Sequence, residues 1–141
     1  PHPMTTLSDP ALEESIDRYY RAIAGRSLAD WLATLSADVT MHEPAESLPA
    51  EGQEGAREAW KVLTAPFREL HYERRATFFS GAGAAVLWRC NAVGVTGGRA
   101  GAEGITIFEF DADGLIQTVV SYWDPAALLI ALAAEGAEPS H

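Results

Sequence analysis

The alternation of apolar and polar residues predicts three helices in the first half of the chain. Asp9-Pro10 is typical of an N-cap followed by proline at the first helical position, and Gly25 is a typical helix end. Between them, apolar side chains recur at helical spacing: Leu12, Ile16, Tyr19 or Tyr20, and Ile23. Ser27 is expected to cap a shorter helix running to about residue 35, and a third helix is expected over about residues 53–63.

From about residue 70 the pattern becomes strand-like, with many β-branched and aromatic residues. Four strands are expected, within residues 70–79, 84–95, 104–111 and 115–124. The sequence DADG at 111–114 is a hairpin-turn signal, and PAALLIALAA from residue 125 predicts a terminal helix. The glycine-rich segment from 94 to 104 is expected to connect two strands.

One short strand, VTMHE at 39–43, precedes the third helix. Helices followed by consecutive strands predict an α+β domain, in which helices cover one face of a curved antiparallel sheet. The 141 residues are enough for one domain, so we expect residues 1–141 to form a single domain with flexible tails at 1–8 and 135–141.

Glu43 occupies an unusual position in this first strand. Alternate side chains of a strand share a face, so Glu43 should point the same way as Val39 and Met41, toward a core. Pro44 then ends the strand. Burial would raise the pKa of a glutamate toward neutrality, which is the range useful for proton transfer. The alternative is a carboxylate at a strand end that reaches solvent or caps the following turn.

The composition excludes several classes of partner. A net charge of −10 argues against nucleic acid and anionic membranes, and no apolar run is long enough to span a bilayer. The four histidines show no metal-ligand spacing, and no phosphate-binding glycine motif opens a helix after a strand, so we expect neither a metal nor a cofactor. Cys90 is the only cysteine, which excludes an internal disulfide, and the N-terminus lacks the features of a signal peptide. We therefore expect a cytoplasmic location.

Three segments resemble the family of nuclear transport factor 2-like domains, over roughly residues 10–130. They are DRYYRAI, VTMHEPAESLPAEGQEGAREAW and IFEFDADGLIQTVVSYWD, in this order and at compatible spacing. The closest parallels are ketosteroid isomerases and SnoaL-like polyketide cyclases. The resemblance implies a cone-shaped sheet that curls around a deep apolar pocket, closed at its side by helices.

The resemblance also implies candidate catalytic residues. Glu43-Pro44 matches the place of the general-base aspartate of ketosteroid isomerases, and Tyr19 aligns with their phenol donor, although Tyr19 is equally consistent with ordinary core packing. Trp60 stands where a supporting tyrosine is usual. Thr106 replaces the protonated aspartate that is the second donor, so steroid isomerisation is expected to be weak.

The residues expected to line the pocket share the inward-facing positions of their strands or belong to the third helix. The choice between pocket and plain core packing stays open for several of them, and Cys90 is interpreted as a small hydrophobic residue. The complete set is Met41, Trp60, Trp88, Cys90, Thr106, Phe108, Val119, Ser121 and Trp123.

The leading hypothesis for function is a cofactor-independent acid/base enzyme, of isomerase or cyclase type, for a small hydrophobic carbonyl or polyketide-like compound. One alternative is an epoxide-opening hydrolase or cyclase that uses Glu43 with a second acid, for which Glu69, Glu73 and Glu103 are candidates. Another is a domain that binds a small molecule or takes part in assembly without catalysis. Four apolar residues on the outer face of the sheet favour a homodimer: Leu87, Val93, Ile105 and Ile107.

Overall fold

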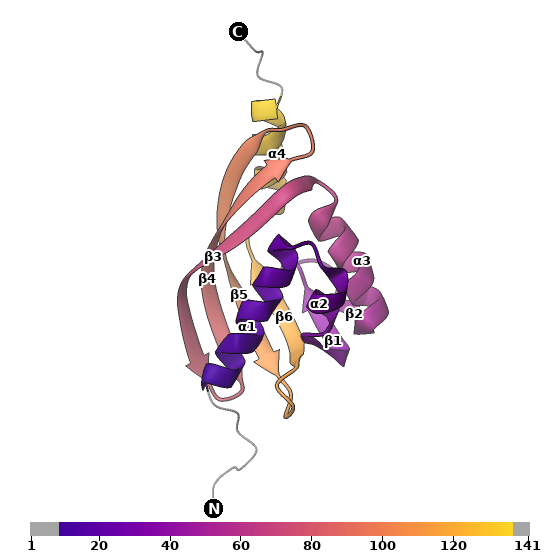
Figure 1. Cartoon of the computed structure of the whole chain (residues 1–141), viewed down its shortest axis with the longest axis vertical. Coiled ribbons are helices and arrows are strands. Elements are labelled where there is room, and N and C mark those ends of the chain that lie inside the picture. The colour runs from indigo at the N-terminus through magenta and orange to yellow at the C-terminus, as the bar shows by residue number, and fades with distance from the viewer. Residues whose placement is uncertain (1–8, 137–141) are drawn as a thin grey trace, which may run out of the picture.

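The computed structural model describes residues 9–136, which fold as helices packed on one curved sheet (Figure 1). The helices are α1 (Asp9–Ala24), α2 (Leu28–Leu32), α3 (Gly52–Thr64) and α4 (Pro125–Gly136). The strands are β1 (Leu35–His42), β2 (Ala50–Glu51), β3 (Phe67–Ser80), β4 (Gly83–Gly94), β5 (Arg99–Phe110) and β6 (Ile116–Tyr122). The predicted α+β class is confirmed, and the order of elements is the predicted one except for β2, a two-residue strand that was not expected.

The six strands form one sheet in the order β2-β1-β6-β5-β4-β3. In β3, the pairing with β4 shifts register between Phe67 and Glu69 and again between Arg74 and Ala76. An extra residue in one strand bends it and increases its twist, so these irregularities help the long β3–β4 pair to curve. Figure 1 shows this pair arching over α1, which lies on the inner side of the curve.

One strand pairing differs from the expected antiparallel arrangement. β1 runs parallel to β6, with Met41 opposite Val119 and His42 opposite Val120, so the sheet is mixed. The sequence between β1 and β6 contains a helix and three long strands, and apolar alternation carries no information about which strand pairs with which. This pairing places the end of β1 beside the end of β6.

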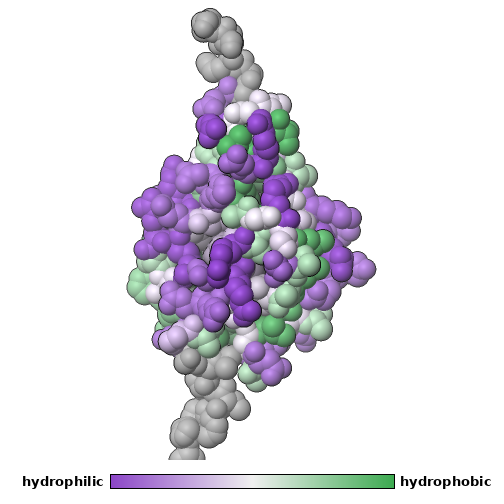
Figure 2. Space-filling view, viewed as in Figure 1, coloured by the Kyte–Doolittle hydropathy of each residue, from purple (hydrophilic) through white to green (hydrophobic). Residues whose placement is uncertain are grey.

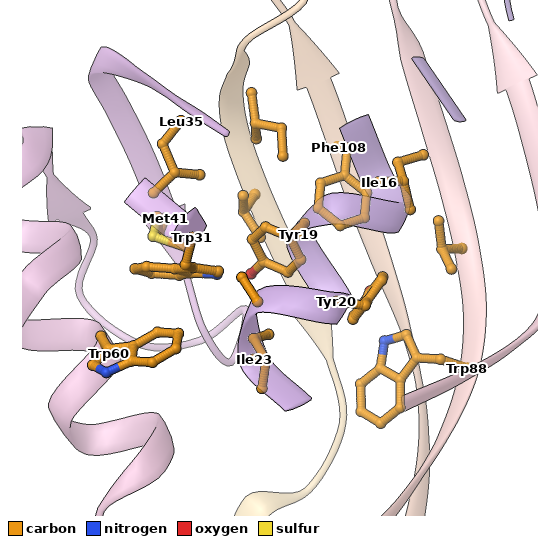
Figure 3. Packing of buried hydrophobic residues seen from close by; sticks show 14 of the residues in the cluster. Ile16, Tyr19, Tyr20, Ile23, Trp31, Leu35, Met41, Trp60, Trp88 and Phe108 are labelled. Carbon is orange, nitrogen blue, oxygen red and sulfur yellow. The ribbon is translucent and has the colours of Figure 1, made fainter. Parts of the chain in front are cut away.

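The inner face of the sheet and the helices enclose a core rich in aromatic side chains (Figure 3). Tyr19 and Tyr20 of α1 pack against Phe108 of β5, at ring-centroid distances of 5.1 and 6.0 Å. Trp31 of α2 contacts Trp60 of α3 at 5.1 Å. These contacts join three helices to the sheet through side chains that bury large apolar areas.

Several boundaries differ from the sequence-based expectation. Ser27 caps α2 as predicted, since its side chain accepts a hydrogen bond from the N–H of Asp30, but α2 ends at Leu32. The segment from Arg99 to Gly104 belongs to β5 instead of a loop. Gly136 ends α4, so residues 135 and 136 are helical, whereas residues 1–8 and 137–141, also expected to be tails, lie outside the described residues. Within residues 9–136, no helix is long and apolar enough to cross a membrane.

Candidate functional site

Glu43 follows the last residue of β1 and continues its alternation. Val39 and Met41, on the same face, are fully buried in the core. The loop after Glu43 is tied to β6, because the N–H of Ala45 donates a hydrogen bond of 2.6 Å to the carbonyl oxygen of Ser121. The Glu43 side chain therefore points inward, toward the side chains at the end of β6.

Both carboxyl oxygens of Glu43 accept a hydrogen bond from this end of β6. Ser121 Oγ donates to Oε1 at 2.6 Å, and Trp123 Nε1 donates to Oε2 at 3.1 Å. Ser121 and Trp123 are two residues apart and therefore share a face of the strand. The two donors hold the carboxyl group at a defined position and orientation.

The environment of Glu43 opposes its ionisation. Burial raises the pKa of its carboxyl from an ordinary value of about 4.5 to about 7, although the hydrogen bonds from Ser121 and Trp123 act in the opposite direction. Desolvation is therefore the larger effect. At neutral pH such a group is ionised about half of the time, so it can both accept and return a proton.

A chain of hydrogen bonds extends behind Ser121, away from Glu43. Ser121 Oγ lies 2.8 Å from Thr106 Oγ1, which in turn accepts a bond of 2.8 Å from Trp88 Nε1. Gly104 makes room for the indole of Trp88 and the Cβ of Trp123, since a Cβ at Gly104 would lie 2.6 Å from Trp88 Cζ2 and 2.7 Å from Trp123 Cβ. The chain links the inner strands β4, β5 and β6 to the carboxyl group.

Glu43 lies at the wall of a cavity of about 450 Å³ between the sheet, α3, α4 and the loop after β1. Glu43, Glu51, Glu58 and the indole of Trp123 are its polar contributors. The other lining side chains are apolar: Met41, Pro44, Leu48, Pro49, Ala50, Gly55, Ala59, Val62, Leu63, Pro66, Phe67, Pro125 and Leu129. Glu51 and Glu58 are solvent-exposed, whereas Glu43 is half-buried, so Glu43 is the most enclosed acid of the cavity.

The structure divides the predicted site residues into three groups. Met41, Glu43 and Trp123 line the cavity. Ser121, Thr106 and Trp88 form the hydrogen-bond chain behind Glu43. The remaining five belong to the buried core and are not cavity-lining residues: Tyr19, Trp60, Cys90, Phe108 and Val119.

Tyr19 lies inside the core close enough to sense Glu43. Its ring packs at 5.8 Å from that of Trp31 and at 5.1 Å from that of Phe108 (Figure 3). Burial, and then the charge of Glu43, raise the pKa of the Tyr19 phenol well above its ordinary value. Tyr19 is therefore a neutral hydrogen-bond donor at physiological pH.

The three acids considered as partners of Glu43 lie on the outer face of the sheet. Glu69 and Glu73 have side chains that are 54% and 62% exposed and form ion pairs with His71 and Arg75. Glu103 is also exposed, opposite Arg89 in the neighbouring strand. The exposed acids that do reach the cavity are Glu51 and Glu58.

A larger and more polar depression, of about 590 Å³, lies between α1 and β3. There Arg74 forms ion pairs with Glu13 at 3.3 Å and with Asp17 at 3.0 Å. Figure 2 shows hydrophilic side chains gathered over this part of the surface. Its acids Glu13 and Asp17 are both paired with Arg74, and Glu43 is not among its lining residues, so the candidate site is the apolar cavity.

Sequence reasoning missed the bonding of Ser121 and Thr106. Strand alternation placed Ser121 and Trp123 on the face that looks inward, which was a usable signal. Their contact with Glu43 depends on the parallel pairing of β1 with β6, and the bond between Thr106 and Ser121 on the register of β5 with β6. Neither the strand pairing nor the register can be predicted from the local alternation of apolar and polar residues.

Comparison with known families identifies the chain. Residues 16–119 match the SnoaL-like domain. The chain belongs to this family. The match covers both β1 and most of the sheet, and it confirms the resemblance to nuclear transport factor 2-like proteins. No curated protein matches the sequence.

Solved structures share the fold of this SnoaL-like chain at low sequence identity. Δ5-3-ketosteroid isomerase from Mycobacterium sp. is 20% identical, with a TM-score of 0.71 over 83% of this chain and 95% of that one. SalBIII, an epoxide hydrolase/cyclase-like enzyme in pyran ring formation in the polyether salinomycin, is 15% identical, with a TM-score of 0.75 over 84% and 95%. RV0760c of Mycobacterium tuberculosis, solved with estradiol-17β-hemisuccinate, is 19% identical, with a TM-score of 0.70 over 81% and 94%.

The raised pKa of Glu43 predicts a specific pH dependence of stability. Its stabilising contribution is fully present below the unfolded pKa of about 4.5 and is lost as pH rises through the folded value of about 7. Between pH 5 and pH 8 the wild type should therefore lose about 2 kcal/mol of unfolding free energy relative to Glu43→Gln. Urea unfolding of both proteins at the two pH values measures this difference.

The exposed neighbour Glu46 provides a matched control, because Glu46→Gln removes a carboxylate from the same loop. That variant should keep the pH dependence of the wild type. Equal pH dependence in the wild type and in Glu43→Gln would place the Glu43 carboxyl in water and contradict the description of the site.

Proposed function

We propose that this SnoaL-like domain is a cofactor-independent acid/base enzyme that moves a proton on a small, mostly apolar carbonyl compound bound beside Glu43. The observation that carries the proposal is a carboxyl group at the wall of an apolar cavity, held by two donors, with a pKa of about 7. A single base of this kind contributes roughly 10²–10⁴-fold to a proton-transfer rate. We place the enzyme in the cytoplasm, in keeping with its single, buried and unpaired cysteine.

In the proposed reaction Glu43 acts twice. As a carboxylate it removes a proton from the carbon next to the substrate carbonyl, and the bond electrons move into an enolate. As a carboxylic acid it then returns the proton. Return to another carbon isomerises the compound. In the alternative, the enolate carbon attacks a second carbonyl and closes a ring, and the proton goes to the alkoxide oxygen formed there. A pKa near neutrality suits both half-reactions.

Stabilisation of the enolate is the weaker part of this site. Thr106 bonds Trp88 and Ser121 and is not a cavity-lining residue. The neutral phenol of Tyr19 is the donor that we assign to a ligand carbonyl reaching past Glu43 into the core. Substrates with an already acidic carbon, such as polyketide-like dicarbonyl compounds, depend less on such a donor than simple steroid ketones do.

The names of the structural relatives agree with this class of ligand. They include an isomerase of ketosteroids, a cyclase-like enzyme of polyether formation and a complex with an estradiol derivative. At 20% identity or less these relatives establish the fold, so the substrate class of this chain is part of the proposal.

Exchange of deuterium for solvent protons tests proton transfer without knowledge of the natural substrate. The probes are 2-tetralone and a β,γ-unsaturated ketosteroid, each deuterated next to the carbonyl. The wild type should accelerate loss of the label, and Glu43→Gln should lower this acceleration by at least about 100-fold. Tyr19→Phe should have a smaller effect, since a phenol donor stabilises the enolate without moving the proton. Proton NMR of the probe measures the rates.

Glu46→Gln is again the control and should exchange at the wild-type rate. If the wild type and Glu43→Gln exchanged a bound probe at the same rate, Glu43 would not be the base, and the acid/base proposal would fail.

A second candidate function is binding without catalysis. One observation favours it. Among the described residues that line the cavity, no free side-chain donor faces Glu43, because the Trp123 indole is already bonded to the carboxyl. Tight binding of a probe by both the wild type and Glu43→Gln, with no exchange by either, would support this function. Epoxide opening has less support, because Glu69, Glu73 and Glu103 lie on the opposite face of the sheet.

We also propose that two copies pair through the outer face of the sheet. Cross-strand register aligns two apolar rows on this face: Phe78, Ala85, Ile107 and Val120, and beside them Ala76, Leu87, Ile105 and Tyr122. Phe78 and Tyr122 are 68% and 58% exposed. Val93, expected on this face, is buried. An apolar block across four strands is large for a surface left in water.

A charge within the block should separate the copies. Ile107→Asp places a carboxylate where the proposed interface excludes water, so the dimer dissociation constant should rise by at least about tenfold. Analytical ultracentrifugation over a micromolar concentration series measures it. Arg57→Asp, on the exposed side of α3, is the control and should not change association. A wild type that sediments as a monomer throughout would contradict the dimer.

A further inference from the structure

The hydrogen-bond chain behind Glu43 has a fixed direction. At one end Trp88 Nε1 can only donate, so Thr106 Oγ1 must accept from it. At the other end the Glu43 carboxylate can only accept, so Ser121 must donate its single hydroxyl proton to Oε1. The bond of 2.8 Å between the two hydroxyl groups must then run from Thr106 to Ser121.

We propose that this chain decides which oxygen of Glu43 exchanges the proton: Oε1 is kept as an acceptor, and Oε2 carries the proton to and from the ligand. The proposal deepens the acid/base function above and rests on it for its catalytic meaning. Trp88, Thr106 and Ser121 are positioning residues in this account, since they act on the ligand only through Glu43.

A proton on Oε1 would conflict with the chain. That proton would point at Ser121 Oγ, so the Ser121 proton would have to turn toward Thr106. Thr106 Oγ1 has two lone pairs and would accept from both Ser121 and Trp88, but its own proton would need a new acceptor. Reversal therefore leaves the buried Thr106 hydroxyl proton without an acceptor within the chain, and a buried donor is costly to leave unpaired.

A proton on Oε2 causes no such conflict. The hydroxyl oxygen of a protonated carboxyl keeps a lone pair, so it still accepts the 3.1 Å bond from Trp123. Trp123 lines the cavity, whereas Ser121 is 1% exposed and does not. Oε2 is therefore the oxygen on the cavity side, and its proton has a path to a bound ligand.

The other titratable groups around Glu43 keep their protons through the relevant pH range. Burial is the main cause that raises the pKa of each phenol of Tyr19 and Tyr20 of α1 and Tyr72 of β3, and the charge of Glu43 adds to it. Burial likewise raises the pKa of the Cys90 thiol of β4. The charged groups on the cavity side are the exposed Glu51 and Glu58. Arg74 lies in the depression between α1 and β3, and its charge lowers the pKa of Tyr20.

Infrared spectroscopy of the carboxyl group tests which oxygen holds the proton. At pH 5 Glu43 is protonated, and its C=O stretch is isolated as the difference between the wild type and Glu43→Gln. The frequency falls as the carbonyl oxygen accepts a stronger hydrogen bond. If Oε1 is that oxygen, Ser121→Ala should shift the band upward, and Trp123→Phe should leave it nearly unchanged. The opposite pattern would place the proton on Oε1 and overturn the proposal.

A matched pair at Thr106 separates positioning from packing. Thr106→Val keeps the shape and removes the hydroxyl, which frees Ser121 Oγ as an acceptor for a proton on Oε1. The Glu43 pKa, followed by carbon-13 NMR, should rise by about half a unit, because the carboxylate loses support and the acid gains a second site. Thr106→Ser keeps the hydroxyl and should retain the wild-type pKa.

Equal shifts in Thr106→Val and Thr106→Ser would make Thr106 a packing residue and sink the proposal. Neither measurement uses a substrate, so their outcomes are independent of the exchange experiment. If the wild type showed no exchange activity but the infrared result was as expected, the proposed enzymatic function would be wrong and the proposed role of the hydrogen-bond chain would stand.

Discussion

The structure depends on one unfavourable placement, a glutamate carboxyl group inside an apolar wall. Desolvation destabilises the charged form more strongly than the two hydrogen bonds from Ser121 and Trp123 stabilise it. The pKa of Glu43 is therefore raised to about 7. The sheet makes this placement possible, because the parallel pairing of β1 with β6 sets Ser121 and Trp123 beside Glu43. Without these donors, a buried carboxyl at this position would be either expelled to water or protonated throughout the physiological range.

Side chains farther from Glu43 also help to hold its carboxyl group in this position. Gly104 leaves room for the indole of Trp88 and the Cβ of Trp123. The Trp123 indole bonds Glu43 directly, and the Trp88 indole is linked to Glu43 through two hydroxyl groups. The buried aromatic cluster excludes water from the inner side, and the apolar cavity leaves the outer side open to a ligand. Thr106, which alignment with isomerases suggested as a ligand donor, is instead part of the support of the base. The fold is thus shared with ketosteroid isomerases, while the hydrogen-bond partners of Thr106 differ from what the resemblance implied.

The features that depend on the local alternation of apolar residues were predicted from the sequence. Those that depend on which strands pair were not. The helices, the long strands and the inward direction of Glu43 all follow from the spacing of apolar residues, and the structure agrees. The mixed sheet did not follow, because no local pattern shows that β1 joins β6. For the same reason Ser121 and Thr106 were placed on the correct face without their bonds. The resemblance implied an apolar pocket, but not that α3, α4 and the loop after β1 would form most of its lining. Tyr19 shows the limit of alignment: it occupies the expected place in α1, yet it packs against Trp31 and Phe108 in the core and is not among the residues that line the cavity.

The central claim is that Glu43 is a desolvated, hydrogen-bonded acid at the cavity. Carbon-13 NMR titration of its carboxyl, assigned by comparison with Glu43→Gln, measures this directly. The account predicts a midpoint near pH 7, which moves upward by about one to two units in Ser121→Ala, because a hydrogen bond to a charged group is lost. A midpoint at or below the ordinary value of about 4.5, unchanged in Ser121→Ala, would contradict it.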